Sequence, residues 1–133
     1  ALAGYFRGRL AVARQEWVPA AKLLEDAGPS VARVPVFYKK AMVGLAACYA
    51  AMQNPDKQLE FCRKARAVDP GFAPAAVGEA EALAKLGRMR DALREYRVLV
   101  NQFEMTGYRA ELVRLELVAA LTGPAPADEA SWK

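Results

Sequence analysis

The sequence contains no histidine. Histidine often serves as a general base near neutral pH and as a metal ligand, so its absence disfavours both kinds of site. Nucleophilic catalysis needs a nucleophile beside a base. Serine occurs only at Ser30, in an expected loop, and at Ser131, in an expected tail. We therefore predict that the protein is not an enzyme, has no catalytic residues and binds no metal or other cofactor.

Residues that favour β-strands are scarce. Isoleucine is absent, and threonine occurs only at Thr106 and Thr122. Alanine, in contrast, supplies 28 of the 133 residues. Alanine has the highest helix propensity, and its small side chain lets helices pack closely. The composition therefore predicts an all-α protein that forms one domain. Its alanine- and arginine-rich character is typical of a bacterial protein.

Long apolar runs and cysteine pairs are also missing. The longest apolar run, from Val43 to Met52, is much shorter than the ~20 residues that a membrane-spanning helix needs. The two cysteines, Cys48 and Cys62, lie in apolar stretches without CxxC spacing. We expect no membrane insertion and two free, buried thiols.

The formal net charge is only +4, and basic residues gather mainly in one region. That region contains Lys85, Arg88, Arg90, Arg94 and Arg97, interleaved with Asp91 and Glu95. Alternating charges are typical of a solvated helix face, so we expect no dedicated nucleic-acid site. We expect Glu79 and Glu81, which are not neighbours on one helix face, to lie on a solvated surface as well.

Turn-forming residues divide the chain into helical segments. We expect seven helices, at about residues 3–14, 18–27, 36–52, 56–68, 73–86, 89–102 and 107–121. Gly28 and Pro29 are expected to end the second helix, Asp56 to cap the fourth, and Gly87 to take a left-handed conformation after the fifth. Short connections make successive helices antiparallel. Residues 122–133, which contain Gly-Pro-Ala-Pro, are expected to form a disordered tail.

The helical segments repeat. Leu45, Ala46 and Tyr49 align with Glu79, Ala80 and Leu83, and the alignment continues through the following helix without a gap. An earlier segment occupies the same columns, with Gly8, Trp17, Ala20, Leu24 and Ala27, and a slightly longer connection separates it from the middle segment. The period of the alignment, about 34 residues, indicates stacked helical hairpins.

On these residues the chain resembles the tetratricopeptide repeat family. The resemblance covers about residues 1–121 and implies a right-handed superhelical solenoid of antiparallel hairpins. It divides the domain into repeats at about 1–34, 39–72 and 73–106, followed by a capping helix at 107–121. Arg114 stands where this family carries a small residue, which implies that the last helix exposes a polar face.

The resemblance also implies a concave groove lined by the first helix of each hairpin. The groove residues that it implies are Tyr5, Arg9, Lys40, Val43, Ala47, Val77, Glu81, Lys85 and Tyr108. Tyrosine and arginine are enriched in binding hot spots, and the middle of the groove is small and apolar. We therefore expect a protein-interaction module that holds a protein segment or peptide with apolar anchors and an acidic residue.

Two alternatives belong to other classes. The chain could be an architectural segment of a longer solenoid or a self-association module, or a helical repeat that binds RNA. The weak clustering of charge disfavours the last of these. The chain does not begin with Met, and a helical pattern starts almost at Ala1. We therefore expect an excerpt from a longer, cytoplasmic protein whose partner the sequence does not identify.

Overall fold

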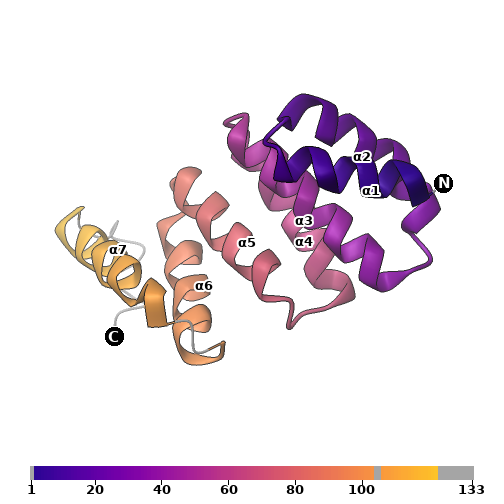
Figure 1. The fold of residues 1–133 in the computed structure, drawn as a ribbon. Coiled ribbons are helices and arrows are strands. Elements are labelled where there is room, and N and C mark those ends of the chain that lie inside the picture. Colours follow the sequence, from indigo (N-terminus) through magenta and orange to yellow (C-terminus); the bar gives the residue numbers. More distant parts are fainter. Residues whose placement is uncertain (1, 104–105, 123–133) are drawn as a thin grey trace.

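The computed structural model describes residues 2–103 and 106–122 of the chain. Within them the chain forms seven α-helices, one short 3-10 helix and no strand (Figure 1). The helices are α1 (Leu2–Ala13), α2 (Trp17–Val31), α3 (Pro35–Ala51), α4 (Pro55–Val68), α5 (Ala73–Lys85), α6 (Met89–Asn101) and α7 (Arg109–Thr122), with the 3-10 helix η1 (Thr106–Tyr108) before α7. The predicted all-α solenoid is confirmed. No helix of the described part is long and apolar enough to cross a bilayer.

Each helix packs against the next one along the chain, so the hairpins stack in sequence order from α1 at one end to α7 at the other (Figure 1). The first helices of successive hairpins also touch, α1 with α3 and α3 with α5. Among the described residues, the second helices α2, α4 and α6 make no such contacts with one another. The stack therefore curves with α1, α3 and α5 on its concave side.

The same turn joins the two helices of each hairpin. Among the described residues, a positive φ occurs at Gln15 (61°), Gln53 (59°) and Gly87 (77°), which occupy the same column of the repeat. In each case the next N–H donates to a carbonyl five residues back, as from Arg88 to Leu83 at 3.0 Å. This bond satisfies a carbonyl that the helix end leaves unpaired. The conformation predicted for Gly87 is confirmed, and two glutamines adopt it as well.

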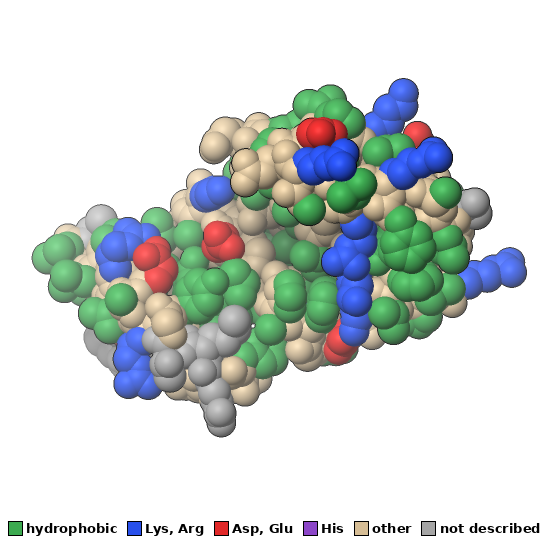
Figure 2. All heavy atoms as spheres, viewed as in Figure 1, with side chains coloured by type: hydrophobic (Ala, Val, Ile, Leu, Met, Phe, Trp, Pro, Cys, Tyr) green, Lys and Arg blue, Asp and Glu red, His purple; other side chains and the backbone are tan. Residues whose placement is uncertain are grey.

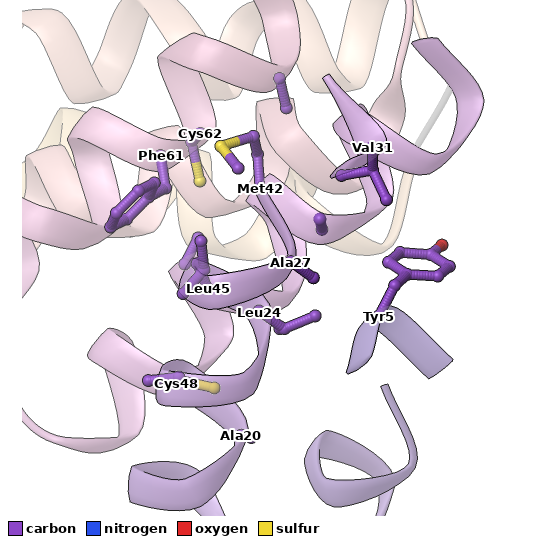
Figure 3. Close-up of a cluster of buried hydrophobic side chains, with 14 of the residues drawn as sticks. Tyr5, Ala20, Leu24, Ala27, Val31, Met42, Leu45, Cys48, Phe61 and Cys62 are labelled. Carbon is purple, nitrogen blue, oxygen red and sulfur yellow. The ribbon is translucent and has the colours of Figure 1, made fainter. Parts of the chain in front are cut away.

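Small residues let the helices approach closely, and large ones fill the gaps between them. The buried cluster drawn in Figure 3 joins the first two hairpins around Leu24 and Leu45, which are almost completely buried. Burying a leucine contributes roughly 2 kcal/mol to stability. A second buried cluster joins α5, α6 and α7 around Leu83, Leu99 and Leu115.

Two expected helix ends are wrong. The second helix continues through Gly28 and Pro29 to Val31, because Val31 is fully buried and its packing holds the last turn in place. Asn54, not Asp56, caps α4: its Oδ1 accepts a hydrogen bond from the Lys57 N–H at 3.2 Å. The last helix runs to Thr122, and the rest of the expected tail lies outside the described residues.

The last helix exposes the polar side chains that we expected, and apolar side chains as well. Arg114 is exposed and forms an ion pair with Glu111. The same helix, however, also exposes Val113, Leu117 and Leu121. A polar cap would place such side chains inward, so α7 leaves an apolar surface at the end of the stack.

Candidate binding site on the concave face

A hollow of about 430 Å³ lies between α3, α4 and α5. It is lined by Val43, Ala46, Ala47, Ala50, Gln58, Cys62, Ala73, Pro74, Val77, Gly78 and Glu81. In the space-filling view, hydrophobic side chains occupy the recess at the centre of this face (Figure 2). The hollow is therefore an apolar depression with few polar groups, which is the usual character of a ligand site.

Small side chains on two parallel first helices create this hollow. Ala46, Ala47 and Ala50 supply the wall from α3, and Gly78 lies in the wall from α5. Close packing around the hairpin α3–α4 brings α3 and α5 near each other. The alanine and glycine side chains that face the gap between α3 and α5 are too short to fill it. The alanine-rich composition thus produces both the close stacking and the hollow.

Four of the predicted groove residues meet at the hollow. Val43 and Ala47 come from α3, and Val77 and Glu81 come from α5, each pair four residues apart. Residues four apart lie on one face of a helix, and the two pairs occupy the same columns of the repeat. The helical period and the repeat register together place the four residues on one surface.

Two predicted lysines lie on the same helices beside the hollow without lining it. Lys40 is half-buried and precedes Val43 by one turn of α3, while Lys85 is exposed and follows Glu81 by one turn of α5. Neither these lysines nor Glu81 forms an ion pair with another residue of the described chain. Three charges thus flank an apolar hollow and are available to a ligand.

The prediction was wrong for Tyr5. This side chain is fully buried, and its ring packs against Phe37 with the ring centres 5.1 Å apart. Its hydroxyl accepts a hydrogen bond from Nη1 of Arg9 at 3.4 Å. Tyr5 therefore belongs to the core between α1 and α3, and Arg9 is exposed above it.

Tyr108 and Arg9 do not join the four residues of the hollow. Tyr108 lies in η1, where its ring centre is 6.0 Å from that of Tyr96, and it is half-buried. Arg9 lies on α1, with its guanidinium carbon 5.9 Å from the centre of the Tyr5 ring. The predicted groove therefore divides into one hollow and two separate positions.

Besides Glu81, the hollow has a second polar lining residue, Gln58, which sequence analysis did not assign to the groove. Its side chain is 3% exposed, and Nε2 donates to the Gly78 carbonyl at 3.1 Å. Its Oε1 is buried and has no hydrogen-bond partner in the described part of the chain. An unsatisfied buried acceptor costs about 1–3 kcal/mol. The sequence signal was a glutamine in a column that otherwise carries Ala20 and Ala92.

The thiol of Cys62 lines the hollow but is not reactive. Burial, and then the nearby Glu79 and Glu81 carboxylates, raise the pKa of Cys62 to about 12. Burial likewise raises the pKa of Cys48 to about 11. The nucleophilic form of cysteine is the thiolate, so both groups stay protonated and inert near neutral pH. Residues 2–103 and 106–122 contain no cluster that could hold a metal ion.

Glu79 does not lie on a solvated surface, as we had expected. It is 8% exposed and accepts hydrogen bonds from Nη1 of Arg66 at 3.1 Å and Nε of Arg63 at 3.3 Å. Arg66 also donates to Glu95 at 2.6 Å. Burial lowers the pKa of Arg66, but the bonds to Glu95 and Glu79 raise it more, so the net shift is upward. Arg66 of α4 thus connects α5 with α6.

Three basic side chains in and next to α6 are paired with acids: Arg88 at its N-cap, and Arg94 and Arg97 within it. Arg88 lies 2.9 Å from Asp91, Arg94 lies 3.7 Å from the same carboxylate, and Arg97 lies 3.5 Å from Glu116. All of these pairs are largely exposed and therefore contribute little to stability. These ion pairs partly neutralise the positive charge of this helix, so its surface attracts phosphate groups less strongly.

Comparison with known proteins assigns no family to the chain: no protein-family model matches it, and no curated protein matches its sequence. The geometry of the hollow therefore carries the functional proposal.

Proposed function

We propose that this protein is an interaction module of the tetratricopeptide-like type that holds a segment of another protein in the hollow between α3 and α5. The observation that supports this proposal is the hollow itself, whose apolar walls come from three helices and whose edge carries Glu81. Concave apolar sites with a few polar groups bind ligands, and helical solenoids present such surfaces between their repeats.

The flanking charges define the chemistry of the partner. In the repeat, Glu81 of α5 corresponds to Ala47 of α3, which lies seven residues after Lys40. Seven residues rise about 10 Å along the helix axis, at about 1.5 Å per residue. Lys40 and Glu81 lie on neighbouring helices, so this offset is only the axial part of their separation, and an extended segment needs at least about three residues to cover it. The partner should therefore carry an acidic residue for Lys40, a basic residue at least about three positions away for Glu81, and apolar side chains between them. Its affinity should be on the order of micromolar, because the segment must be ordered on binding.

Fluorescently labelled peptides would test this proposal by anisotropy. The probe has an Asp-Val-Leu-Lys core, and three relatives replace the Asp, the Leu or the Lys with Ser. We expect each replacement to weaken binding, and the loss of Leu to weaken it most, because apolar burial supplies most of the binding free energy. Val77→Glu should abolish binding, whereas Val18→Glu, an exposed valine on the opposite layer, should not change it.

A charge reversal gives a readout that misfolding cannot mimic. Glu81→Lys should weaken binding of the Asp-Val-Leu-Lys peptide and strengthen binding of an Asp-Val-Leu-Asp peptide, since only cations then flank the hollow. Arg94→Glu, on α6, serves as the matched control and should change neither affinity. If all peptides bind equally and Val77→Glu has no effect, the hollow is not the binding site.

A further inference from the structure

The polar side chains of the hollow offer acceptors to a ligand. The carboxylate of Glu81 only accepts hydrogen bonds. The amide of Gln58 already uses Nε2 to donate to the Gly78 carbonyl, and its Oε1 has no partner among the described residues. The remaining polar group of the lining side chains is the thiol of Cys62, which is a weak donor. A ligand in the hollow therefore gains most from a group that donates.

The Gln58 amide is held in a fixed position. Its bond to Gly78 joins α4 to the backbone of α5 at 3.1 Å, and Gln58 is 3% exposed. At the same glycine, Sγ of Cys62 leaves no room for a Cβ, so the two helices are in direct contact there. The oxygen of this amide cannot turn to another partner without breaking the bond to Gly78. Its lack of a partner is unfavourable, and a donor from a ligand would remove that cost.

The equivalent positions of the other repeats carry no acceptor. The column of Gln58 contains Ala20 and Ala92, and both are fully buried. A small apolar side chain is thus sufficient for packing at this place in a hairpin. Gln58 instead brings a buried acceptor without a partner, and such a group in a native protein calls for an explanation other than packing.

The depth of Gln58 decides which part of a bound segment meets it. Lys40 and Glu81 lie on α3 and α5, the helices of the concave side, whereas Gln58 lies on α4, in the layer behind them. A segment whose charged residues meet Lys40 and Glu81 runs across the open side of the hollow. Only a side chain that points inward from such a segment reaches the floor at Gln58.

The chemistry of the floor favours a side chain with one donor and no acceptor. The surrounding walls are apolar, with Val43, Ala47 and Val77 among them, so an extra acceptor would be buried unpaired. Hydroxyl, amide and imidazole side chains all carry acceptor lone pairs, and lysine and arginine bring a charge that is costly to bury. Tryptophan combines an uncharged donor with no acceptor. The hollow of about 430 Å³ has room for its large apolar ring.

We propose that the hollow takes a tryptophan side chain of the partner segment, whose indole N–H donates to Oε1 of Gln58. This inference rests on the proposed function and names the anchor of the segment, which stands where the probe peptide has leucine. Oε1 is covered in the described structure, so lining side chains shift slightly to admit the indole while the bond to Gly78 is kept. Side-chain movements of this kind are common on binding, and tryptophan is enriched in binding hot spots.

Two peptides that differ only in the donor test the hydrogen bond. One has an Asp-Val-Trp-Lys core, and in the other benzothienylalanine replaces the tryptophan, so that sulfur takes the place of the indole N–H. Anisotropy of the labelled peptides measures both affinities. The wild-type chain should bind the tryptophan peptide about three- to tenfold more tightly, the ratio that one net hydrogen bond gives. Val77→Glu should abolish binding of both peptides.

Gln58→Leu removes the acceptor and should remove this preference, so that the two peptides bind with equal affinity. Gln102→Leu provides the matched control, because Gln102 is an exposed glutamine at the C-cap of α6 and its loss should leave the preference unchanged. Circular dichroism and urea unfolding establish that both variants are folded. The comparison of the two peptides on the wild-type chain needs no variant.

Free indole gives a readout that does not depend on the charged residues of a peptide. In amide NMR spectra, indole at millimolar concentration should shift the signals of Val77 and Gly78. The compound 1-methylindole has the same ring without the donor, so it should shift these signals only at several-fold higher concentration. Indole binding without peptide binding would support the tryptophan anchor and contradict the charges proposed for the partner.

The outcomes separate this inference from the proposed function. If both peptides bind the wild-type chain equally and Val77→Glu abolishes binding, the hollow holds a segment but Gln58 does not read a donor, and this inference alone is wrong. A preference that survives in folded Gln58→Leu would also overturn it, because another acceptor would then hold the indole. If neither peptide nor indole binds the wild-type chain, the proposed function and this inference are both wrong.

Discussion

The Sγ atom of Cys62 lies 2.5 Å from the point where a side chain on Gly78 would place its Cβ. Real Cβ atoms do not approach another atom so closely. The absence of a side chain at Gly78 therefore sets the distance between α4 and α5. This contact also forms part of the wall of the hollow, and Gln58 bonds to the carbonyl of the same glycine.

Gly78→Ala should lower the free energy of unfolding by about 2 kcal/mol, because an inserted methyl group overpacks a tight core. The loss should occur although alanine favours the helix more than glycine does. Adding Cys62→Ala should recover much of it, since the smaller side chain makes room, and the two substitutions touch and should not be additive. Urea unfolding of both single variants and the double variant measures the coupling. Additive losses would contradict the contact.

Arg66 should matter more for stability than Arg63, although both bond to Glu79. The Arg66 side chain is 21% exposed and bridges Glu79 and Glu95, whereas the Arg63 side chain is 52% exposed and bonds to Glu79 alone. Removing one partner of a buried ion pair leaves the other charge uncompensated. Arg66→Ala should therefore lower the free energy of unfolding by about 2 kcal/mol, and Arg63→Ala by less than about 1 kcal/mol.

Chemical denaturation of the two variants, at low and high salt, provides the comparison. The Arg63 effect should shrink at high salt because exposed charges are screened, while the Arg66 effect should persist. Equal losses for both variants would mean that burial of Glu79 does not depend on Arg66.

The phenol of Tyr49 should titrate unusually late. Its hydroxyl donates to the Glu25 carboxylate at 2.5 Å, and this bond, together with burial, raises the pKa of Tyr49 to about 12. Because the folded pKa is raised, the stabilising effect of this bond is fully present below the usual pKa of about 10 and is lost as the pH rises through about 12.

The tyrosinate absorbance band, followed by titration, reports this group. Glu25→Gln removes the negative charge and should return the pKa of Tyr49 toward its usual value. Burial is the main cause that raises the pKa of Tyr96 to about 12, so that group should titrate as late in the variant as in the wild type. If Glu25→Gln leaves the titration curve unchanged, Glu25 does not hold the Tyr49 hydroxyl.

Nucleic acid should bind only weakly and without sequence preference. Arg88, just before α6, and Arg97 within it are paired with acids, and phosphate contacts made by so few charges weaken steeply with added salt. Binding of a labelled single-stranded RNA should therefore disappear by about physiological salt. Submicromolar affinity at that salt, lost when Arg90, Arg94 and Arg97 are changed to Glu, would contradict this expectation.

The helices were predictable because their signals are local. Glycine, proline and asparagine mark the turns, and the repeat register places three helix ends in one column. The resemblance to the tetratricopeptide repeat family implied Val43, Ala47, Val77 and Glu81 as groove residues, and the structure brings these four to one hollow. The end of α2 was not predictable in this way, because it depends on the burial of Val31 against distant residues.

Burial of individual side chains was the main source of error. Tyr5 was assigned to the groove, but Phe37 of another helix covers it, and no local pattern indicates that contact. Glu79 was assigned to the surface, but Arg66 of the preceding helix holds its carboxylate in a buried position. The polar face expected from Arg114 did not predict that α7 also exposes Val113, Leu117 and Leu121. Such properties arise from packing between helices and not from periodicity within one.

Two prolines of α2 should have opposite effects on stability, although both lie in one helix. Pro19 is the third residue of α2, where the N–H would have no partner within the helix, so proline costs little there. Pro29 lies inside the helix, where its ring opposes the carbonyl of Glu25 and the chain loses one hydrogen bond.

Pro29→Ala should therefore raise the free energy of unfolding by about 1 kcal/mol, less than the full cost of an interior proline because proline also restricts the unfolded chain. Pro19→Ala recovers no hydrogen bond and frees the unfolded chain, so it should lower the free energy of unfolding by about 0.5 kcal/mol. Thermal and urea unfolding of the two variants give the comparison. A loss of stability for Pro29→Ala would mean that α2 does not continue to Val31 in solution.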